Sequence, residues 1–206
     1  FIAGNNSYAG GHKSIFSVVR YGNVMGSRGS VIPFFLSLKD KGELPITDKR
    51  MTRFMITLNQ GVELVWHAFK DMKGGEIYVK KIPSIKVTDI AEVIDPSAKH
   101  KITGIRPGEK LHEEMISSDD SSSTYEYSGY YKILPQINGW EKDNLRIKKG
   151  KKVSEGFFYS SDSNSQWMTK SDLKKWISVN KDYVGKIWIM IPYGRQEITE
   201  SDINLA

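Results

Sequence analysis

The feature that most constrains this chain is a glycine-rich turn at residues 22–30, between two apolar segments. The β-branched run at 15–19 predicts a buried strand, and the apolar run at 31–38 predicts a helix. A strand, a polar loop and a helix in this order are typical of α/β folds. We therefore expect an α/β fold with this loop beyond the carboxyl end of its strand, where ligands bind in such sheets.

Two interpretations of the turn stay open. Gly22, Gly26 and Gly29 would let the backbone approach a ligand, Arg28 offers a cation, and Ser30 can cap the next helix, whose amides favour an anion. Alternatively, the glycines serve only the geometry of a tight turn. The spacing G-x-x-x-G-x-x-G differs from the dinucleotide fingerprint G-x-G-x-x-G, so the pattern alone does not decide.

Composition narrows the classes of function. The 206 residues include no cysteine, which excludes a disulfide scaffold, a thiolate nucleophile and a cysteine zinc site. The four histidines have no paired spacing, so we expect no metal site. No apolar stretch approaches the ~20 residues of a membrane helix, and no signal peptide pattern appears, so we expect a cytoplasmic protein without a membrane partner.

The net charge of +6 suits an anionic small molecule. The densest basic run, at 146–152, contains no aromatic residue on which a base could stack, so we expect a solvated loop and no nucleic-acid partner.

Local patterns predict further alternating elements. Thr57 with Gln60 is a capping box, and the helix that it begins carries an apolar stripe of Leu58, Val62, Val65, Trp66 and Phe69. His67 lies off that stripe and is expected to be exposed. Helices are also expected at 30–39, from Thr88, at 111–116 and at 171–179. Extended segments are expected at 44–47, 76–79, 85–87, 100–105, 130–134 and 157–159, and a mobile loop at 117–123.

Two arginines, Arg53 and Arg106, each follow or end an expected extended segment. Pro107 and Gly108 restrict Arg106, and Glu109 lies three residues on, so the pair can place a guanidinium on a phosphate and a carboxylate on a sugar hydroxyl. Surface ion pairing is the alternative, and the residues alone do not choose between the two.

Five motifs together carry a resemblance to a known family. They are VRYGNV at 19–24, GSRGSVIPFF at 26–35, PITD at 45–48, RMTRF at 50–54 and GIRPGEKLHE at 104–113. In this order they resemble the inverting UDP-N-acetylglucosamine 4,6-dehydratases of the extended short-chain dehydrogenase/reductase superfamily, over residues 1 to about 186. The resemblance implies the C-terminal part of an NAD(P)-binding Rossmann-like fold with its small substrate-binding domain.

The resemblance also implies roles for particular residues. Asn23 would touch substrate and cofactor, Val24 would line the cofactor, and the turn from Arg28 to Val31 would approach the sugar nucleotide. Thr47 would line the uracil pocket. Arg53 and Arg106 would hold the diphosphate, and Glu109 would meet the ribose. The substrate-binding set is therefore Asn23, Arg28, Gly29, Ser30, Val31, Thr47, Arg53, Arg106 and Glu109.

Such enzymes use NADP to oxidise the sugar at C4, lose water across C5 and C6, and return the hydride to C6 with inversion at C5. The product serves the synthesis of pseudaminic acid for surface and flagellar glycans. The family's catalytic Y-x-x-x-K pair is missing, because none of the ten tyrosines has a lysine four residues on. We expect no catalytic residue in this chain, and a homo-oligomeric parent enzyme. Rival interpretations are a related epimerase or retaining dehydratase, and a non-catalytic sugar-nucleotide-binding or interface module.

The expected division is residues 1–116 as Rossmann-like and substrate-binding region, and 117–186 as a C-terminal extension. Residues 187–206 are expected as a read-through tail, because 190–199 resembles the start of a pyridoxal-phosphate aminotransferase. A genuine fusion is the alternative. In either case Trp188 onward is expected to lack a packing role.

Overall fold

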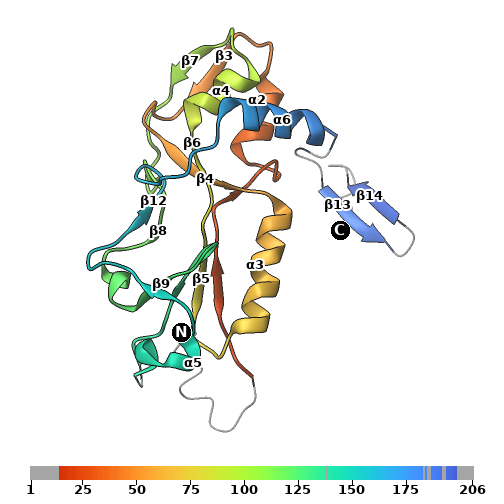
Figure 1. Ribbon diagram of the computed structural model, residues 1–206. Coiled ribbons are helices and arrows are strands. Elements are labelled where there is room, and N and C mark those ends of the chain that lie inside the picture. The colour runs from red at the N-terminus through yellow and green to blue at the C-terminus, as the bar shows by residue number, and fades with distance from the viewer. Residues whose placement is uncertain (1–13, 138, 183, 185–186, 192–193, 199–206) are drawn as a thin grey trace. The chain divides into compact units, whose positions relative to one another are not determined.

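Two parallel strand pairs organise the chain, one in each of two interleaved units. The computed structural model describes residues 14–137, 139–182, 184, 187–191 and 194–198 (Figure 1). Unit 1 comprises Phe1–Gly22, Thr52–Ser84 and His112–Trp167, and unit 2 comprises Asn23–Met51, Ile85–Leu111 and Met168–Ala206. These units group residues by their contacts. The three segments expected from the sequence, 1–116, 117–186 and 187–206, were instead assigned by resemblance to other proteins, and that division stays a prediction.

Unit 1 is built on a five-stranded sheet in the order β1-β5-β10-β9-β11. Strand β1 (Val18–Arg20) runs parallel to β5 (Ile77–Lys80), with Val18 opposite Ile77. The remaining pairs are antiparallel: β10 (Tyr130–Ile133) with β5, β9 (Thr124–Glu126) with β10, and β11 (Lys151–Lys152) with β9. The strands expected at 76–79 and 130–134 are thus confirmed.

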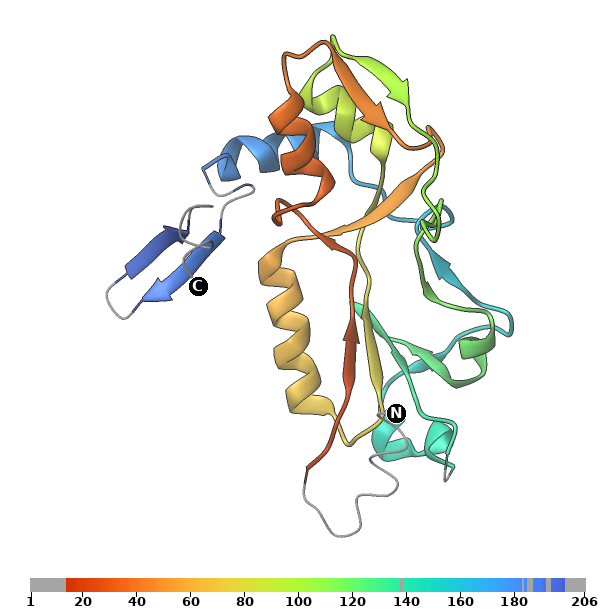
Figure 2. The same cartoon turned by 180° about the vertical axis from the view of Figure 1, so that it is seen from behind.

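Helix α3 (Leu58–Asp71) lies beside β1 and β5 in unit 1 and follows strand β4 (Thr52–Ile56), as Figures 1 and 2 both show. Its capping box is confirmed, because the Thr57 side chain accepts from the Gln60 amide while the Gln60 side chain accepts from the Thr57 amide. Leu64 and Ala68 bury one face of the helix against Tyr78 of β5.

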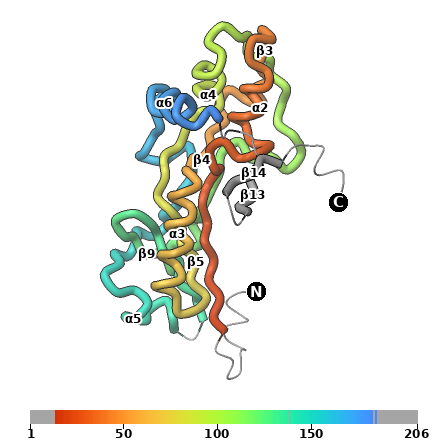
Figure 3. The backbone as a smooth tube through the Cα atoms, turned by 90° about the vertical axis from the view of Figure 1, so that its right-hand side faces the viewer, coloured from red at the N-terminus to blue at the C-terminus, as the bar shows by residue number. Residues whose placement is uncertain are grey.

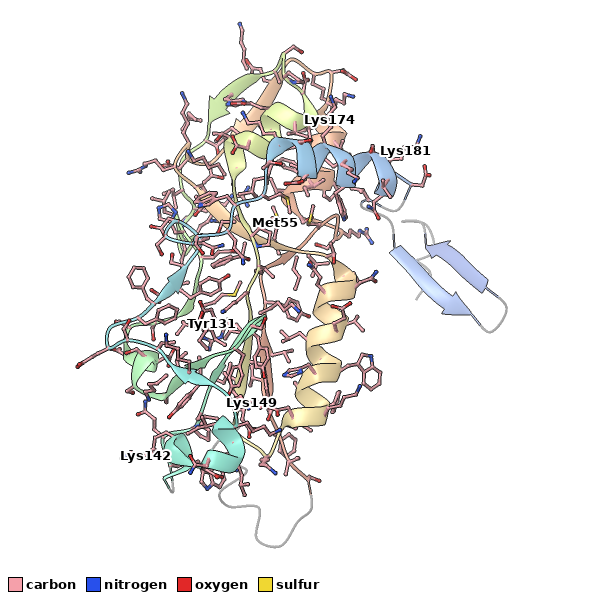
Figure 4. All side chains as sticks on the ribbon, viewed as in Figure 1. Met55, Tyr131, Lys142, Lys149, Lys174 and Lys181 are labelled. Atoms are coloured by element: carbon pink, nitrogen blue, oxygen red, sulfur yellow. The ribbon has the colours of Figure 1, made fainter. Side chains whose placement is uncertain are left out.

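Short elements complete unit 1. Strands β8 (Glu114–Ile116) and β12 (Tyr159–Ser160) pair antiparallel, and two 3₁₀ turns, η1 (Asp119–Ser123) and η2 (Trp140–Lys142), precede the short helix α5 (Asn144–Ile147). Tyr131, labelled in Figure 4, packs its ring on that of Tyr159, with centroids 5.3 Å apart.

Unit 2 packs helices around the second parallel pair, β3 (Glu43–Ile46) with β7 (Lys99–Ile102). Helices α2 (Val31–Leu38), α4 (Val87–Ile94) and α6 (Lys170–Asn180) are its main helices, and α4 contacts α2, α6 and β3, as the tube in Figure 3 helps to follow. The core of the unit includes the buried side chains Ile32, Phe35, Leu44, Ile90 and Leu173. Pro45 lies in a two-stranded sheet, so its missing amide does not interrupt a central strand.

The remaining described strands are short or lie late in the chain. Strand β2 (Asn23–Val24) precedes the glycine turn, and β6 (Ser84–Lys86) precedes α4. Strands β13 (Ile187–Ile191) and β14 (Gly194–Ile198) form an antiparallel hairpin. The expected absence of a packing role from Trp188 onward concerns side chains outside the described residues, so it stays a prediction.

Two expectations for the region after residue 110 are wrong. Residues 114–116 form strand β8 in place of a helix, because Met115 and Ile116 are buried and the segment pairs with β12. Residues 119–123 form a 3₁₀ turn in place of a mobile loop. Asp120 organises this turn by accepting a hydrogen bond from Ser117 Oγ at 2.9 Å, and its carbonyl accepts from Thr124 Oγ1 at 2.7 Å.

The basic run at 146–152 is only partly the solvated loop that its composition predicted. Arg146 is buried, and its Nη1 lies 2.7 Å from Glu76 Oε1 and donates to the Gly74 carbonyl, also at 2.7 Å. Its guanidinium also covers the Trp140 ring at 4.1 Å. Lys149, labelled in Figure 4, is exposed. Burial of Arg146 depends on Glu76, which lies 70 positions away and gives no local signal.

His67 is also not exposed as expected. Its ring packs on Tyr130 with centroids 4.4 Å apart, and burial lowers its pKa, although the nearby Asp71 charge acts in the opposite direction. The described parts of the chain contain no helix that is long and apolar enough to cross a membrane.

Candidate functional site

Residues 25–30 of the glycine-rich turn lie in unit 2 between β2 and α2, whereas Gly22 precedes β2 and belongs to unit 1. Two hydrogen bonds form the turn, from the Ser27 amide to the Val24 carbonyl at 3.2 Å and from the Ser30 amide to the Ser27 carbonyl at 3.1 Å. Met25 is buried beneath the turn, whereas Arg28 and Gly29 are exposed. The turn and the helix expected from the sequence are therefore present, with Arg28 on the outside. The expectation of a buried strand at 15–19 is wrong: strand β1 covers only Val18–Arg20 and is half-buried, and Ile15 and Phe16 are exposed, because only 18–20 pair with β5.

The three glycine positions of the turn differ in what surrounds them. A Cβ on Gly22 would lie 2.5 Å from Phe54 Cβ and 2.7 Å from the Phe54 carbonyl oxygen, so close backbone packing within unit 1 accounts for Gly22. At Gly26 a Cβ would lie 2.7 Å from the Trp176 ring. Gly29 has a φ of +75°, and a Cβ added there would meet nothing within 4 Å, so it alone leaves open space beside Arg28. Gly26 has a φ of +74° as well, so turn geometry and packing account for Gly22 and Gly26, and the interpretation of the turn as a ligand loop stays a prediction.

Ser30 occupies the N-cap position of α2 but does not cap it. Its side chain makes no capping hydrogen bond, and its hydroxyl instead donates to the Ser27 carbonyl at 2.6 Å. The expectation that Ser30 caps the helix is wrong, because a nearer backbone acceptor in the turn takes the hydroxyl.

Thr47 and the segment that leads to Arg106 leave the same edge of a sheet. Strands β3 and β7 are parallel, with Ile46 opposite Ile102, and the Thr103 amide donates to the Ile46 carbonyl at 2.9 Å. The carboxyl ends of both strands therefore meet, which is where ligands bind in parallel sheets. The structure brings these two predicted site segments together.

The turn after β7 presents Arg106 to solvent. The Arg106 amide donates to Glu109 Oε2 at 3.3 Å, and the Glu109 amide donates to the Arg106 carbonyl at 3.0 Å. Gly104 and Gly108 have φ angles of +85° and +79°, with nothing within 4 Å of a Cβ at either position. Glu109 is thus held against the Arg106 backbone, and the Arg106 side chain is exposed in an open turn.

Arg50, two residues after Asp48, forms a two-point ion pair with it. Arg50 Nη2 lies 2.8 Å from Asp48 Oδ2, and Arg50 Nε lies 3.0 Å from Asp48 Oδ1. The hydrogen bond and the charge of Asp48 raise the pKa of Arg50. Among the arginines of the matched motifs, Arg50 is therefore already engaged by a neighbouring carboxylate.

Arg53 belongs to unit 1, and it lies inside strand β4; it neither follows nor ends that strand, contrary to expectation. Its Nη1 donates to the Thr52 carbonyl at 2.7 Å, and its Nε lies 3.9 Å from Glu113 Oε1. Glu113 Oε2 in turn accepts from the Phe54 amide at 2.8 Å. The carboxylate of Glu113 therefore ties the end of the fifth motif to the fourth.

A polar network around β4 was not found from the sequence. Thr52 Oγ1 lies 2.7 Å from Ser161 Oγ and 2.8 Å from His112 Nδ1, and Ser161 Oγ accepts from the Glu113 amide at 2.9 Å. Thr52 and Ser161 are buried. His112 and Glu113 belong to the fifth motif, which could have pointed to this network, whereas Ser161 belongs to none of the five motifs. Within the described ranges, no group of three histidine, cysteine or acidic side chains is arranged to hold a metal ion.

The site and the fold together define an α/β protein with two exposed, arginine-bearing turns, one after β2 and one after the carboxyl ends of β3 and β7. Exposed arginines beside open glycine turns are suited to bind phosphate groups. Residues 1–135 match the family model described as "Polysaccharide biosynthesis protein". The chain belongs to this family.

Similar proteins extend this result. The chain is 54% identical over 180 residues to the "UDP-N-acetylglucosamine 4,6-dehydratase (inverting)" of Campylobacter jejuni subsp. jejuni serotype O:2, which covers 84% of the chain and 54% of the relative. It is 40% identical over 179 residues to the "UDP-glucose 4-epimerase" of Rickettsia prowazekii, covering 84% and 52%.

A solved structure is also similar. "Pen from Bacillus thuringiensis" aligns with a TM-score of 0.74 and 33% identity over 87% of this chain and 54% of Pen. The chain therefore spans about half the length of the curated relatives and of the structure that it matches.

Proposed function

We propose that this chain forms part of a nucleotide-sugar dehydratase that acts on UDP-N-acetylglucosamine with inversion at C5. The observation that carries the proposal is the 54% identity to the Campylobacter jejuni dehydratase, against 40% to the Rickettsia prowazekii epimerase over a stretch of nearly equal length. The five motifs that suggested this class from the sequence all lie within the chain's first 113 residues.

The proposed substrate site in unit 2 combines the turn from Arg28 to Val31, which approaches the sugar nucleotide, with Thr47 at the uracil and Arg106 at the diphosphate. The exposure of Arg28 and Arg106 supports these roles, as does the shared sheet edge from which Thr47 and the Arg106 segment leave. Glu109, held by the Arg106 amide, would accept from a ribose hydroxyl. A negatively charged diphosphate would be stabilised by charge-assisted hydrogen bonds from the guanidinium.

In unit 1, Arg53 is the second proposed diphosphate ligand. Its hydrogen bond to the Thr52 carbonyl and the neighbouring Glu113 carboxylate restrict its guanidinium, so less side-chain freedom would be lost on binding. The Thr52, Ser161 and His112 network would keep β4 and the end of the fifth motif in register and so would position Arg53 indirectly.

NADP is the proposed cofactor, and it would supply hydride transfer. Asn23 and Val24 form strand β2 and are half-buried, so each keeps a partly open side chain that fits contact with a cofactor ring. The fit is partial, because the chain holds neither the G-x-G-x-x-G fingerprint nor a tyrosine with lysine four residues on. Asn23 would also orient the substrate beside that ring.

The wider proposal is a lyase in the cytoplasm that acts as a homo-oligomer and supplies pseudaminic acid synthesis for flagellin and surface glycans. The net charge of +6 is consistent with an anionic substrate.

The test is to extend the gene upstream and assay the product with UDP-N-acetylglucosamine, following the sugar by NMR. A UDP-4-keto-6-deoxy sugar with inverted C5 is expected. A C4 epimer that retains its C6 oxygen would instead identify an epimerase. Absence of any turnover, with no upstream reading frame, would favour a non-catalytic sugar-nucleotide-binding module.

A further inference from the structure

The indole of Trp176, on helix α6, packs directly against the glycine turn of the proposed substrate site. A Cβ on Gly26 would lie 2.7 Å from Trp176 Cη2 and 3.5 Å from its Cζ3, so the ring occupies the space that a side chain would need. Val184 Cγ2 lies 3.3 Å from the same position. These residues all belong to unit 2. No local pattern indicates the contact, because Gly26 and Trp176 are far apart along the chain.

Helix α6 holds this ring in a defined place. The helix begins with a capping box between Thr169 and Asp172, and Leu173 is fully buried one turn before Trp176. After the tryptophan, Asn180 Nδ2 donates to the Trp176 carbonyl at 2.8 Å. Helix α6 contacts α4, which contacts α2, the helix that begins directly after the glycine turn. The ring is therefore supported from the same packed unit that carries the turn.

The turn itself combines a flexible backbone with an exposed tip. Gly26 and Gly29 have φ angles of +74° and +75°, and glycine loses more conformational freedom on ordering than any other residue. The amides of Ser27 and Ser30 close the turn by hydrogen bonds to backbone carbonyls, and Arg28 at the tip is exposed. A rigid ring against Gly26 restricts the turn from outside, next to the first of these hydrogen bonds.

We propose that Trp176 is a positioning residue of the sugar-nucleotide site, which holds the turn from Arg28 to Val31 through Gly26 in the conformation that receives the substrate. The identity of the ligand rests on the proposed function, whereas the support of the turn rests on the packing alone. Trp176 acts through the turn and not by touching the reacting atoms. A turn that is already ordered loses less freedom when the ligand binds, so the ring strengthens binding.

The first measurement needs no ligand. Hydrogen exchange in the extended gene product is followed by mass spectrometry on peptides that contain Ser27 and Ser30, whose bonded amides report opening of the turn. Trp176→Ala should raise their exchange rate about tenfold, whereas peptides from α3 in unit 1 should exchange as in the wild type. Trp176→Phe, which keeps a ring, should stay within about twofold of the wild type, as should the control Val179→Ala, whose side chain is 70% exposed on the same helix.

The second measurement is binding and turnover of UDP-N-acetylglucosamine by the same proteins. Trp176→Ala should weaken the affinity in calorimetric titration about tenfold and raise KM by a similar factor, with kcat within about twofold, because the turn holds ground state and transition state alike. Trp176→Phe should restore the affinity of the wild type. Loss of kcat with unchanged KM would overturn the assignment as a positioning residue for binding.

Unchanged exchange at Ser27 and Ser30 in Trp176→Ala would overturn the proposal, and so would faster exchange with unchanged affinity. If Trp176→Ala also raises exchange in α3, the milder Trp176→Leu takes its place and is judged by the same two results. A wild type that does not bind UDP-N-acetylglucosamine would contradict the proposed function and the identity of the ligand. The exchange at Ser27 and Ser30 would still decide whether Trp176 holds the turn.

Discussion

Asp71, the last residue of α3, is the hub of a buried charge cluster in unit 1. Its Oδ2 accepts from Lys132 Nζ at 2.6 Å and from the Tyr78 hydroxyl at 2.9 Å, and its Oδ1 pairs with Lys148. Burial by itself raises the pKa of Asp71, but the hydrogen bonds from Lys132, Lys148 and Tyr78 outweigh it and hold this pKa well below its usual range. Asp71 is therefore the counter-ion of Lys132, whose side chain is 1% exposed.

Replacing Asp71 by asparagine would leave the Lys132 ammonium buried without a counter-charge. Breaking such a pair by removing one partner typically costs about 3–5 kcal/mol of unfolding free energy. Urea denaturation at neutral pH measures this loss, with the exposed Asp119→Asn as the matched control. A loss below about 1 kcal/mol would show that Lys132 finds sufficient compensation in the Arg146 carbonyl, to which it donates at 2.7 Å.

The same cluster predicts a pH dependence. The pKa of Asp71 is lower in the folded chain than the value of about 3.9 for an unfolded aspartate, so its stabilisation is fully present above that value. The stabilisation is lost as the pH falls below about 4, because the unfolded state then binds the proton first. The difference in urea midpoint between the wild type and Asp71→Asn should therefore be smaller at pH 2.5 than at pH 7. An unchanged difference would contradict the assignment.

Arg106 is the residue on which the proposed substrate site depends most. Replacing Arg106 by alanine in the extended gene product should weaken binding of UDP-N-acetylglucosamine by about 1.5 to 3 kcal/mol, because a charged hydrogen bond to the diphosphate is lost. Calorimetric titration measures the affinity, and Lys101→Ala, an exposed cation on β7, is the control. Equal affinities for the wild type and Arg106→Ala would show that Arg106 does not bind the diphosphate and would favour the alternative of surface ion pairing.

At the scale of elements, α3 and α2 begin differently although both have a hydroxyl residue at the N-cap. Thr57 makes the capping hydrogen bond and Ser30 does not. Thr57→Ala should cost about 1 kcal/mol of unfolding free energy, and Ser30→Ala less than about 0.5 kcal/mol, since only an exposed turn hydrogen bond is lost. Urea denaturation of both variants compares them directly, and equal losses would contradict the cap assignment.

The sequence predicted elements well where the signal is local. The capping box of α3 and strand β10 follow from neighbouring residues, and both are confirmed. The conformation of 114–116 was not predicted correctly, because three residues with two apolar side chains fit either a helix or a strand. Pairing with β12 decided in favour of the strand. The buried Arg146 and the network of Thr52 with Ser161 also depend on partners far along the chain.

At the scale of the whole chain, the proposed catalytic machinery is incomplete within these 206 residues. We expect the chain by itself not to turn over UDP-N-acetylglucosamine, because it holds no Y-x-x-x-K pair, which the resemblance to the dehydratases implies for catalysis. An NMR assay of the purified chain with NADP and substrate tests this expectation, with the extended gene product as the positive control. Measurable formation of a 4-keto sugar by the chain alone would show that its own residues are sufficient.

The sequence by itself determined the α/β class, the family and the two arginine-bearing turns, because these depend on short motifs whose residues are close along the chain. Only the tertiary structure decided that Gly22 and Gly26 serve packing while Gly29 borders open space, and that Thr47 and the Arg106 segment leave one sheet edge. It also showed that the stripe on α3 is largely exposed. Local patterns report the propensity of a segment, whereas burial and pairing are set by residues that meet only after folding.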